Sequence, residues 1–111
     1  MSVLIRIKDA DNSVVAHAPD GGEKAILLEN SFYFLPEQVD MTYLKKTDAI
    51  YRCPYKGVAY WYDLEAPGIS AKKVAWVYED PMAGYEHIGG RIAFYMRETS
   101  ATHVENKLLT S

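Results

Sequence analysis

Short apolar segments that alternate with a period of two constrain the fold of this chain more than any other feature. In the segment Val3 to Lys8, the side chains of Val3, Ile5 and Ile7 share one side. Successive side chains of a strand point to opposite faces of a sheet, so this pattern predicts a half-buried strand. Segments of similar character predict strands at Val3–Lys8, Ser13–Ala18, Phe32–Leu35, Met41–Leu44, Ala49–Arg52, Val58–Leu64, Lys73–Glu79 and Arg91–Arg97.

The composition agrees with a mainly β fold. Nine tyrosines stand among 111 residues, and aromatic side chains pack well on a pleated sheet. A chain of this length can bury one hydrophobic core but not two. We therefore expect a single β domain over residues 1–97 and a C-terminal tail over residues 98–111. The run Ala25 to Glu29 fits a strand or a helix, because a short apolar run has no decisive period.

Helical structure is expected only in short pieces. Pro36 is placed to open a single helical turn, where its missing N–H costs nothing. Asp80 and Pro81 fit the N-cap and first position of a second short helix, so Asp80 is predicted to be chiefly structural. In the tail, Thr102 to Glu105 matches a capping box, which predicts a short helix through Leu109.

Charge and cysteine content exclude several classes of protein. The net charge is −3 and the basic residues are scattered, so a nucleic-acid partner is not expected. The chain has no run of about 20 apolar residues for a membrane helix and no secretion signal at its start. Cys53 is the only cysteine, which excludes an internal disulfide and a four-cysteine zinc site. We expect a cytoplasmic protein that folds without zinc and needs no cofactor, with the oligomeric state left open.

The centre of the chain concentrates aromatic and charged side chains. Trp76 and Tyr78 lie two residues apart on one predicted strand, so they share a face. One interpretation is a core of large rings whose hydroxyls reach water. The other is a pocket whose rings stack on a planar ligand. The predicted ligand-binding residues are Tyr55, Lys56, Trp61, Trp76, Tyr78 and Glu79.

Four polar residues of this region are candidates for a chemical role. Glu79 and Asp80 are adjacent on a strand and point to opposite faces, so they do not converge on a metal. Cys53 is a small buried cysteine or, with a lowered pKa and a nearby base, a nucleophile. Lys56 is a solvated turn residue or a contact for an anionic ligand.

The chain resembles the family catalogued as domain of unknown function 427. The resemblance runs from about Val3 to Met96, and its weaker parts precede residue 50. The tail after Arg97 departs from the pattern. The most specific parts of the resemblance are Cys53–Gly57, Tyr60–Trp61, Trp76–Pro81 and Ile92–Tyr95.

The resemblance implies a compact β-tent-like domain of two antiparallel sheets with one or two short helices. Other β-tent proteins commonly carry zinc on paired cysteines, which this chain lacks. The family is also sometimes labelled nucleotidyltransferase-like, although converging carboxylates and a phosphate-cradling loop are not evident. We therefore expect binding of a small planar or anionic molecule in the aromatic pocket. The alternatives are an enzyme acting on a nucleotide, with Lys56 on phosphate and Glu79 as base, and a protein-interaction module that uses a sheet edge.

Overall fold

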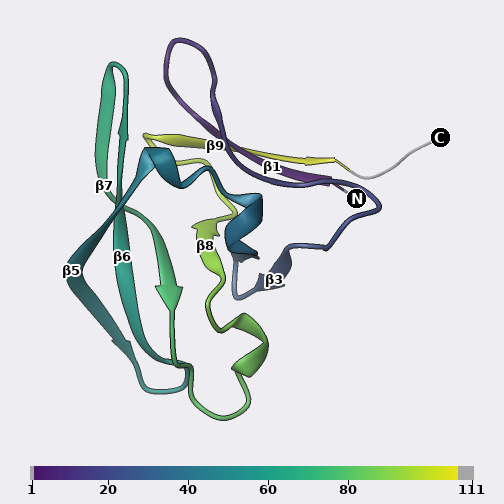
Figure 1. The fold of residues 1–111 in the computed structure, drawn as a ribbon, viewed down its shortest axis with the longest axis vertical. Helices are drawn as coiled ribbons and strands as arrows, with labels where there is room; N and C mark the ends of the chain where they lie inside the picture. The colour runs from purple at the N-terminus through teal and green to yellow at the C-terminus, as the bar shows by residue number, and fades with distance from the viewer. Residues whose placement is uncertain (1, 108–111) are drawn as a thin grey trace.

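In the computed structural model, which describes residues 2–107, nine β-strands form two antiparallel sheets (Figure 1). The smaller sheet has the order β2–β1–β9, and the larger one has the order β3–β4–β8–β7–β6–β5. The bounds are β1 Ser2–Ile7, β2 Val14–Ala18, β3 Ile26–Leu28, β4 Ser31–Phe34, β5 Leu44–Cys53, β6 Gly57–Ala66, β7 Ile69–Tyr78, β8 Ile92–Tyr95 and β9 Thr102–Lys107. The mainly β fold predicted from the sequence is confirmed.

Among the described strands, five pairs of sheet neighbours are consecutive in the chain. β1 and β2 form the predicted hairpin, and β5, β6 and β7 follow one another as a meander. The ambiguous segment before residue 30 is a strand, β3, which pairs with β4 through a two-residue turn. Both turn residues, Glu29 and Asn30, have positive φ angles of 51° and 65°. Two consecutive left-handed residues are typical of the type I′ turn that matches the twist of a hairpin.

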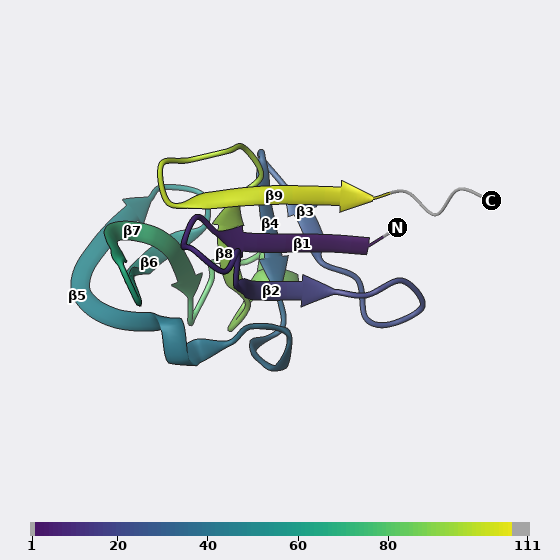
Figure 2. The same ribbon diagram turned by 90° about the horizontal axis from the view of Figure 1, so that it is seen from above.

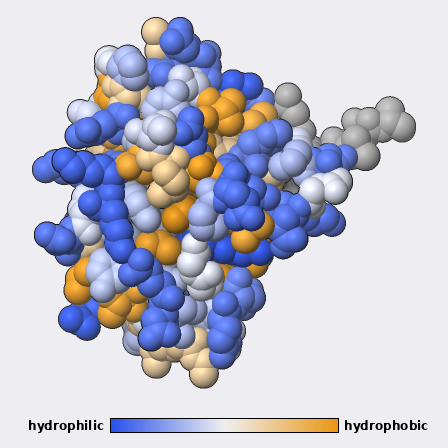
Figure 3. Space-filling model, in the orientation of Figure 1, coloured by the Kyte–Doolittle hydropathy of each residue, from blue (hydrophilic) through white to orange (hydrophobic). Residues whose placement is uncertain are grey.

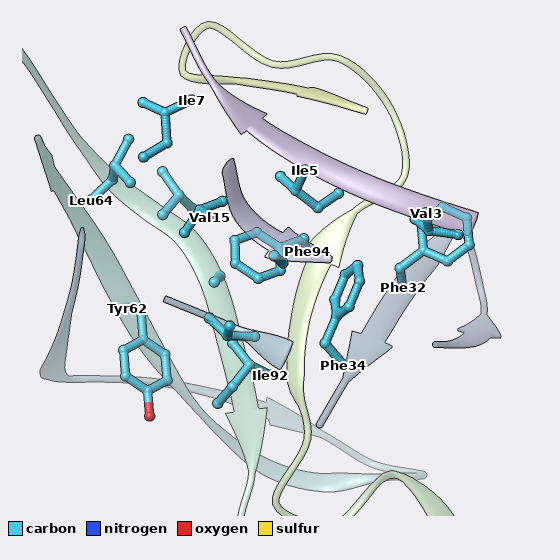
Figure 4. Packing of buried hydrophobic residues seen from close by; sticks show 14 of the residues in the cluster. Val3, Ile5, Ile7, Val15, Phe32, Phe34, Tyr62, Leu64, Ile92 and Phe94 are labelled. Carbon is cyan, nitrogen blue, oxygen red and sulfur yellow. The ribbon is translucent and has the colours of Figure 1, made fainter. Parts of the chain in front are cut away.

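The hydrophobic core lies between the two sheets, whose strands run crosswise when seen from above (Figure 2). Val3, Ile5 and Ile7 of β1 are almost fully buried, as their alternation predicts. They meet apolar side chains of the larger sheet, among them Phe34 and Phe94 (Figure 4). The rings of Phe34 and Phe94 pack edge to face with centroids 5.9 Å apart. One continuous core therefore holds the sheets together, as expected for a chain of this length.

Helical structure is limited to three 3₁₀ turns among the described residues: Pro36–Gln38, Met41–Tyr43 and Glu86–Ile88. The turn at Pro36 is confirmed. The strand predicted at Met41–Leu44 is wrong, because Asp40 caps a 3₁₀ turn there through a hydrogen bond from the Thr42 backbone N–H. The helix predicted at Asp80 is also wrong, since residues 79–85 are irregular and the next helical turn begins at Glu86.

The helix predicted from Thr102 is replaced by strand β9. This strand pairs with β1 over its full length, with Ile5 opposite Val104. Thr102 and Val104 turn toward the core while His103 is exposed, so the segment has the two-residue period of a strand. The helix was predicted because the match to a capping box was given more weight than this period. Pairing satisfies the backbone groups along an otherwise open edge of β1, which a short helix could not do. Leu108 and Leu109 lie outside the described residues.

The surface seen in Figure 3 carries hydrophobic residues in patches between hydrophilic ones. Several large apolar side chains are exposed, including Leu27 at 55% and Tyr55 at 72%. In the part of the chain that the structure describes, no helix is long and apolar enough to span a membrane.

Candidate functional site: an aromatic pocket on the larger sheet

The larger sheet carries two kinds of side chain on its two faces. On β7, Ala75 and Val77 belong to the core between the sheets, whereas Trp76 and Tyr78 belong to a second cluster on the opposite face. Trp76 is the direct cross-strand partner of Trp61 on β6, so both tryptophans of the chain stand on that face. Side chains opposite each other in an antiparallel pair are close enough to touch. We call this set the aromatic cluster; its members are Tyr33, Trp61, Trp76, Tyr78 and Tyr95.

Trp76 is the centre of the aromatic cluster. Its ring centroid lies 5.5 Å from that of Trp61, 4.8 Å from that of Tyr95 and 6.5 Å from that of Tyr33. All three contacts are edge-to-face or tilted, which is the geometry that aromatic pairs prefer. Trp76 is 8% exposed, while Trp61 and Tyr95 are only half-buried. The cluster is thus closely packed at its centre and open at its sides.

The aromatic cluster forms the wall of a cavity of about 640 Å³. This volume is within the range that binds small organic molecules. The cavity, which we call the aromatic pocket, is lined by Glu29, Asn30, Ser31, Tyr33, Tyr51, Lys56, Ala59, Trp61, Trp76, Tyr78, Tyr95, Met96 and Arg97. Its wall therefore combines flat apolar rings with a few polar groups, the composition usual for a ligand site.

Lys56 is the most buried charged side chain of the pocket wall, at 7% exposure. It lies on the turn between β5 and β6, where Gly57 has a φ of 111° that favours glycine. Its ammonium donates to the carboxylate of Glu29, which comes from the β3–β4 turn. The Sγ atom of Cys53 lies 3.7 Å from the same ammonium.

These contacts change the acidity of the groups involved. Burial alone lowers the pKa of Lys56, but the Glu29 carboxylate and the Cys53 sulfur outweigh it and raise that pKa, so the ammonium stays charged at neutral pH. Burial alone raises the pKa of Cys53, yet the backbone N–H groups of Lys56 and Tyr55 and the Lys56 charge lower it overall. Burial raises the pKa of Tyr78 to about 12.

Four of the six residues predicted to bind a ligand lie around this one pocket: Lys56, Trp61, Trp76 and Tyr78. The other two do not. Tyr55 points into solvent at the tip of its turn and is absent from the lining. Glu79 pairs with Lys46 at 2.7 Å, and that lysine lies over the ring of Tyr60, away from the pocket.

Sequence reasoning missed three important members of the lining: Glu29, Tyr33 and Tyr95. The last two could have been found. Tyr33 alternates with the buried Phe32 and Phe34, and Tyr95 follows Phe94, so both tyrosines belong to the opposite face of their strands. No local signal indicates that Glu29 reaches Lys56, because the two are 27 residues apart.

Metal binding has no visible basis in the described residues, where no three His, Cys, Asp or Glu side chains gather. Lys56, predicted as the phosphate ligand of a nucleotide enzyme, lines the aromatic pocket, whereas Glu79, predicted as its base, does not. Folding without zinc stays a prediction.

The family resemblance seen in the sequence is confirmed by a family model. The chain belongs to the family described as a domain of unknown function (DUF427), whose model matches residues 5–105. A search of curated proteins gives no match to this chain.

Proposed function

We propose that the aromatic pocket binds a small planar molecule. The observation that carries this proposal is the gathering of both tryptophans and four tyrosines around one cavity, on the face of the larger sheet opposite the core between the sheets. A side chain needed only for stability would gain more from full burial, yet Trp61 and Tyr95 keep exposed surface beside the cavity. Exposed ring surface beside a cavity offers contact area to a flat ligand.

The polar end of the pocket would orient such a ligand. The ion pair between Lys56 and Glu29 presents a donor and an acceptor side by side. A planar compound with a donor and an acceptor on one edge would replace solvent there without leaving a buried charge unpaired. The pair is thus a source of selectivity among flat molecules of similar size.

The test uses the two tryptophans as reporters. Because both of them line the pocket, the indole N–H signals of ¹⁵N-labelled protein report on this site alone. We expect planar compounds in a metabolite library, such as nucleobases, indoles and benzoates, to shift both signals, and Trp61→Ala to weaken binding by about tenfold or more.

Tyr55→Ala is the matched control, since Tyr55 belongs to the same region but lies outside the lining. It should bind the same compounds as the wild-type protein. The proposal fails if no planar compound shifts either indole signal, or if Tyr55→Ala and Trp61→Ala weaken binding equally.

No specific observation favours the nucleotide-enzyme or the protein-interaction alternative. The cytoplasmic location and the lack of a nucleic-acid partner stay predictions, which a fluorescent fusion and a nucleic-acid binding assay would check.

A further inference from the structure

A second cavity of about 270 Å³ adjoins the aromatic pocket. It lies between the first half of β7 and the segment that leads from β8 to β9. We call it the basic cleft; its lining consists of Ala71, Lys72, Lys73, Val74, Tyr95, Arg97, Thr99, Ser100 and Ala101. Three of these residues are cations and none is a carboxylate, so the cleft is electropositive.

A bulge in β7 brings the lysines of the basic cleft to its rim. Tyr62 and Leu64 on β6 pair with Ala75 and Ala71 on β7, so β7 has two extra residues in this interval. Lys73 within the bulge has a φ of 56°, and its backbone N–H donates to the Asp63 carboxylate at 3.0 Å. A bulge redirects the side chains of its strand, and bulges are frequent beside binding sites. A non-glycine residue with a positive φ angle, such as Lys73, is strained, and such residues are also common at binding sites.

In the part of the chain that the structure describes, the side-chain cations of the cleft differ from Lys56 in forming no ion pair with a carboxylate. Within residues 2–107, no ion pair joins Lys72, Lys73 or Arg97 to an acidic side chain, whereas Glu29 already neutralises Lys56. The carboxylate of Glu98, next to Arg97 in the chain, pairs instead with the Lys8 ammonium at 3.0 Å and with the His103 ring at 2.6 Å. The positive charge available to a ligand is therefore in the basic cleft and not at Lys56.

The basic cleft and the aromatic pocket share two residues in their walls, Tyr95 and Arg97. The Arg97 guanidinium lies 4.6 Å from the centroid of the Tyr95 ring. The Lys73 ammonium lies 5.9 Å from the centroid of the Trp61 ring, so it too connects the cleft with the pocket. A molecule whose ring stacks in the pocket would hold a substituent within reach of these cations.

We propose that the basic cleft binds a phosphate group of the molecule whose planar ring occupies the aromatic pocket, an inference that rests on the proposed function above. The ligand class is a phosphorylated planar compound of the size of a nucleoside phosphate. Lys72 and Arg97 bind the phosphate oxygens, because guanidinium and ammonium groups form charge-assisted hydrogen bonds with phosphate. The ion pair of Lys56 and Glu29 contacts the ring edge.

The experiment compares each of the four common ribonucleosides with its 5′-monophosphate and 5′-diphosphate. Dissociation constants come from the two indole N–H signals of the full chain. We expect at least one base for which the phosphates tighten binding by about tenfold in about 0.05 M salt, and for which about 0.5 M salt removes most of this gain.

Lys72→Gln tests the cleft, because Lys72 lines the basic cleft and not the aromatic pocket. This variant should reduce the ratio of nucleoside to nucleotide dissociation constants by about fivefold. Lys24→Gln is the matched control, since Lys24 is exposed and lines neither cavity, and it should keep the wild-type ratio.

The possible failures can be told apart. If nucleosides bind but phosphates add nothing, or if Lys72→Gln and Lys24→Gln give the same ratio, the inference about the cleft is wrong and the aromatic pocket stands. If neither these compounds nor any other planar compound shifts the indole signals, both proposals are wrong.

Discussion

The two faces of the larger sheet use the same strands for different purposes. Facing the smaller sheet, β7 presents Ala75 and Val77, and β8 presents Phe94, all nearly inaccessible to solvent. On the opposite face the same strands present Trp76 and Tyr95, which have polar atoms and surround a cavity. The core face contains few groups that need hydrogen bonds, whereas almost every large side chain of the pocket face can form one. The comparison teaches that burial alone does not separate core from site; the chemistry of the buried groups does.

The difference between the faces should appear first in stability. Phe94 is 1% exposed and packs against Phe34 in the core. Phe94→Ala removes this ring and leaves a cavity, so the free energy of unfolding should fall by about 3–5 kcal/mol. Trp61→Ala removes a half-buried ring on the pocket face, where water can fill the space, and should lower it by about 1–2 kcal/mol. Urea unfolding followed by circular dichroism measures both values.

If Phe94→Ala does not fold, Phe94→Leu replaces it, with an expected loss of about 1–2 kcal/mol. The comparison between the faces is wrong if the tryptophan variant loses as much stability as the phenylalanine one.

The second prediction concerns alkaline pH and the pocket face. Burial raises the pKa of Tyr78 from 10.0 to about 12, so the folded state disfavours the charged tyrosinate. Its contribution to stability is therefore fully present below pH 10 and is lost as the pH rises from 10 to 12. At about 1.4 kcal/mol for each pKa unit, the loss amounts to roughly 2–3 kcal/mol. Tyr78→Phe should lose less stability than the wild-type protein over this interval.

Urea unfolding at pH 8, 10 and 11.5 checks this prediction. The difference in free energy of unfolding between wild type and Tyr78→Phe should be close to its pH 8 value at pH 10 and should depart from it strongly at pH 11.5. A constant difference at every pH would mean that the Tyr78 hydroxyl is not desolvated, although the residue is only 3% exposed.

The sequence predicts those features of each sheet face that depend on residues close together in the chain. Alternation along one strand is local, so the separation of Trp76 and Tyr78 from Val77 could be predicted, and so could the burial of Val3, Ile5 and Ile7. The pairing of Lys56 with Glu29 could not, because it depends on how the β3–β4 turn lies relative to the β5–β6 turn. The basic cleft could not be predicted either, because it depends on a bulge in β7 that no residue pattern in the sequence indicates.

Capping residues were the least reliable signal. Thr102 to Glu105 matches a capping box but forms a strand, because pairing with β1 satisfies more backbone groups than one helical turn would. Asp80 before Pro81 matches an N-cap as well, yet the chain there stays irregular, and the Met82 N–H donates to the Lys56 carbonyl at 2.9 Å. A local motif indicates a helix only where the tertiary structure leaves its backbone groups unpaired.

The last prediction compares two aspartates, Asp40, which caps a 3₁₀ turn, and Asp80, which begins no helix. Asp40 adjoins the core face, where its backbone N–H donates to Val15, and its carboxylate accepts hydrogen bonds from the Thr42 backbone at 3.2 Å and from the Thr42 hydroxyl at 2.6 Å. Asp40→Ala should therefore cost about 1 kcal/mol in the free energy of unfolding. Asp80 is exposed and begins no helix, so Asp80→Ala should cost less than about 0.5 kcal/mol. Chemical denaturation of the two variants in parallel measures the difference, and equal losses would show that Asp80 caps backbone groups after all.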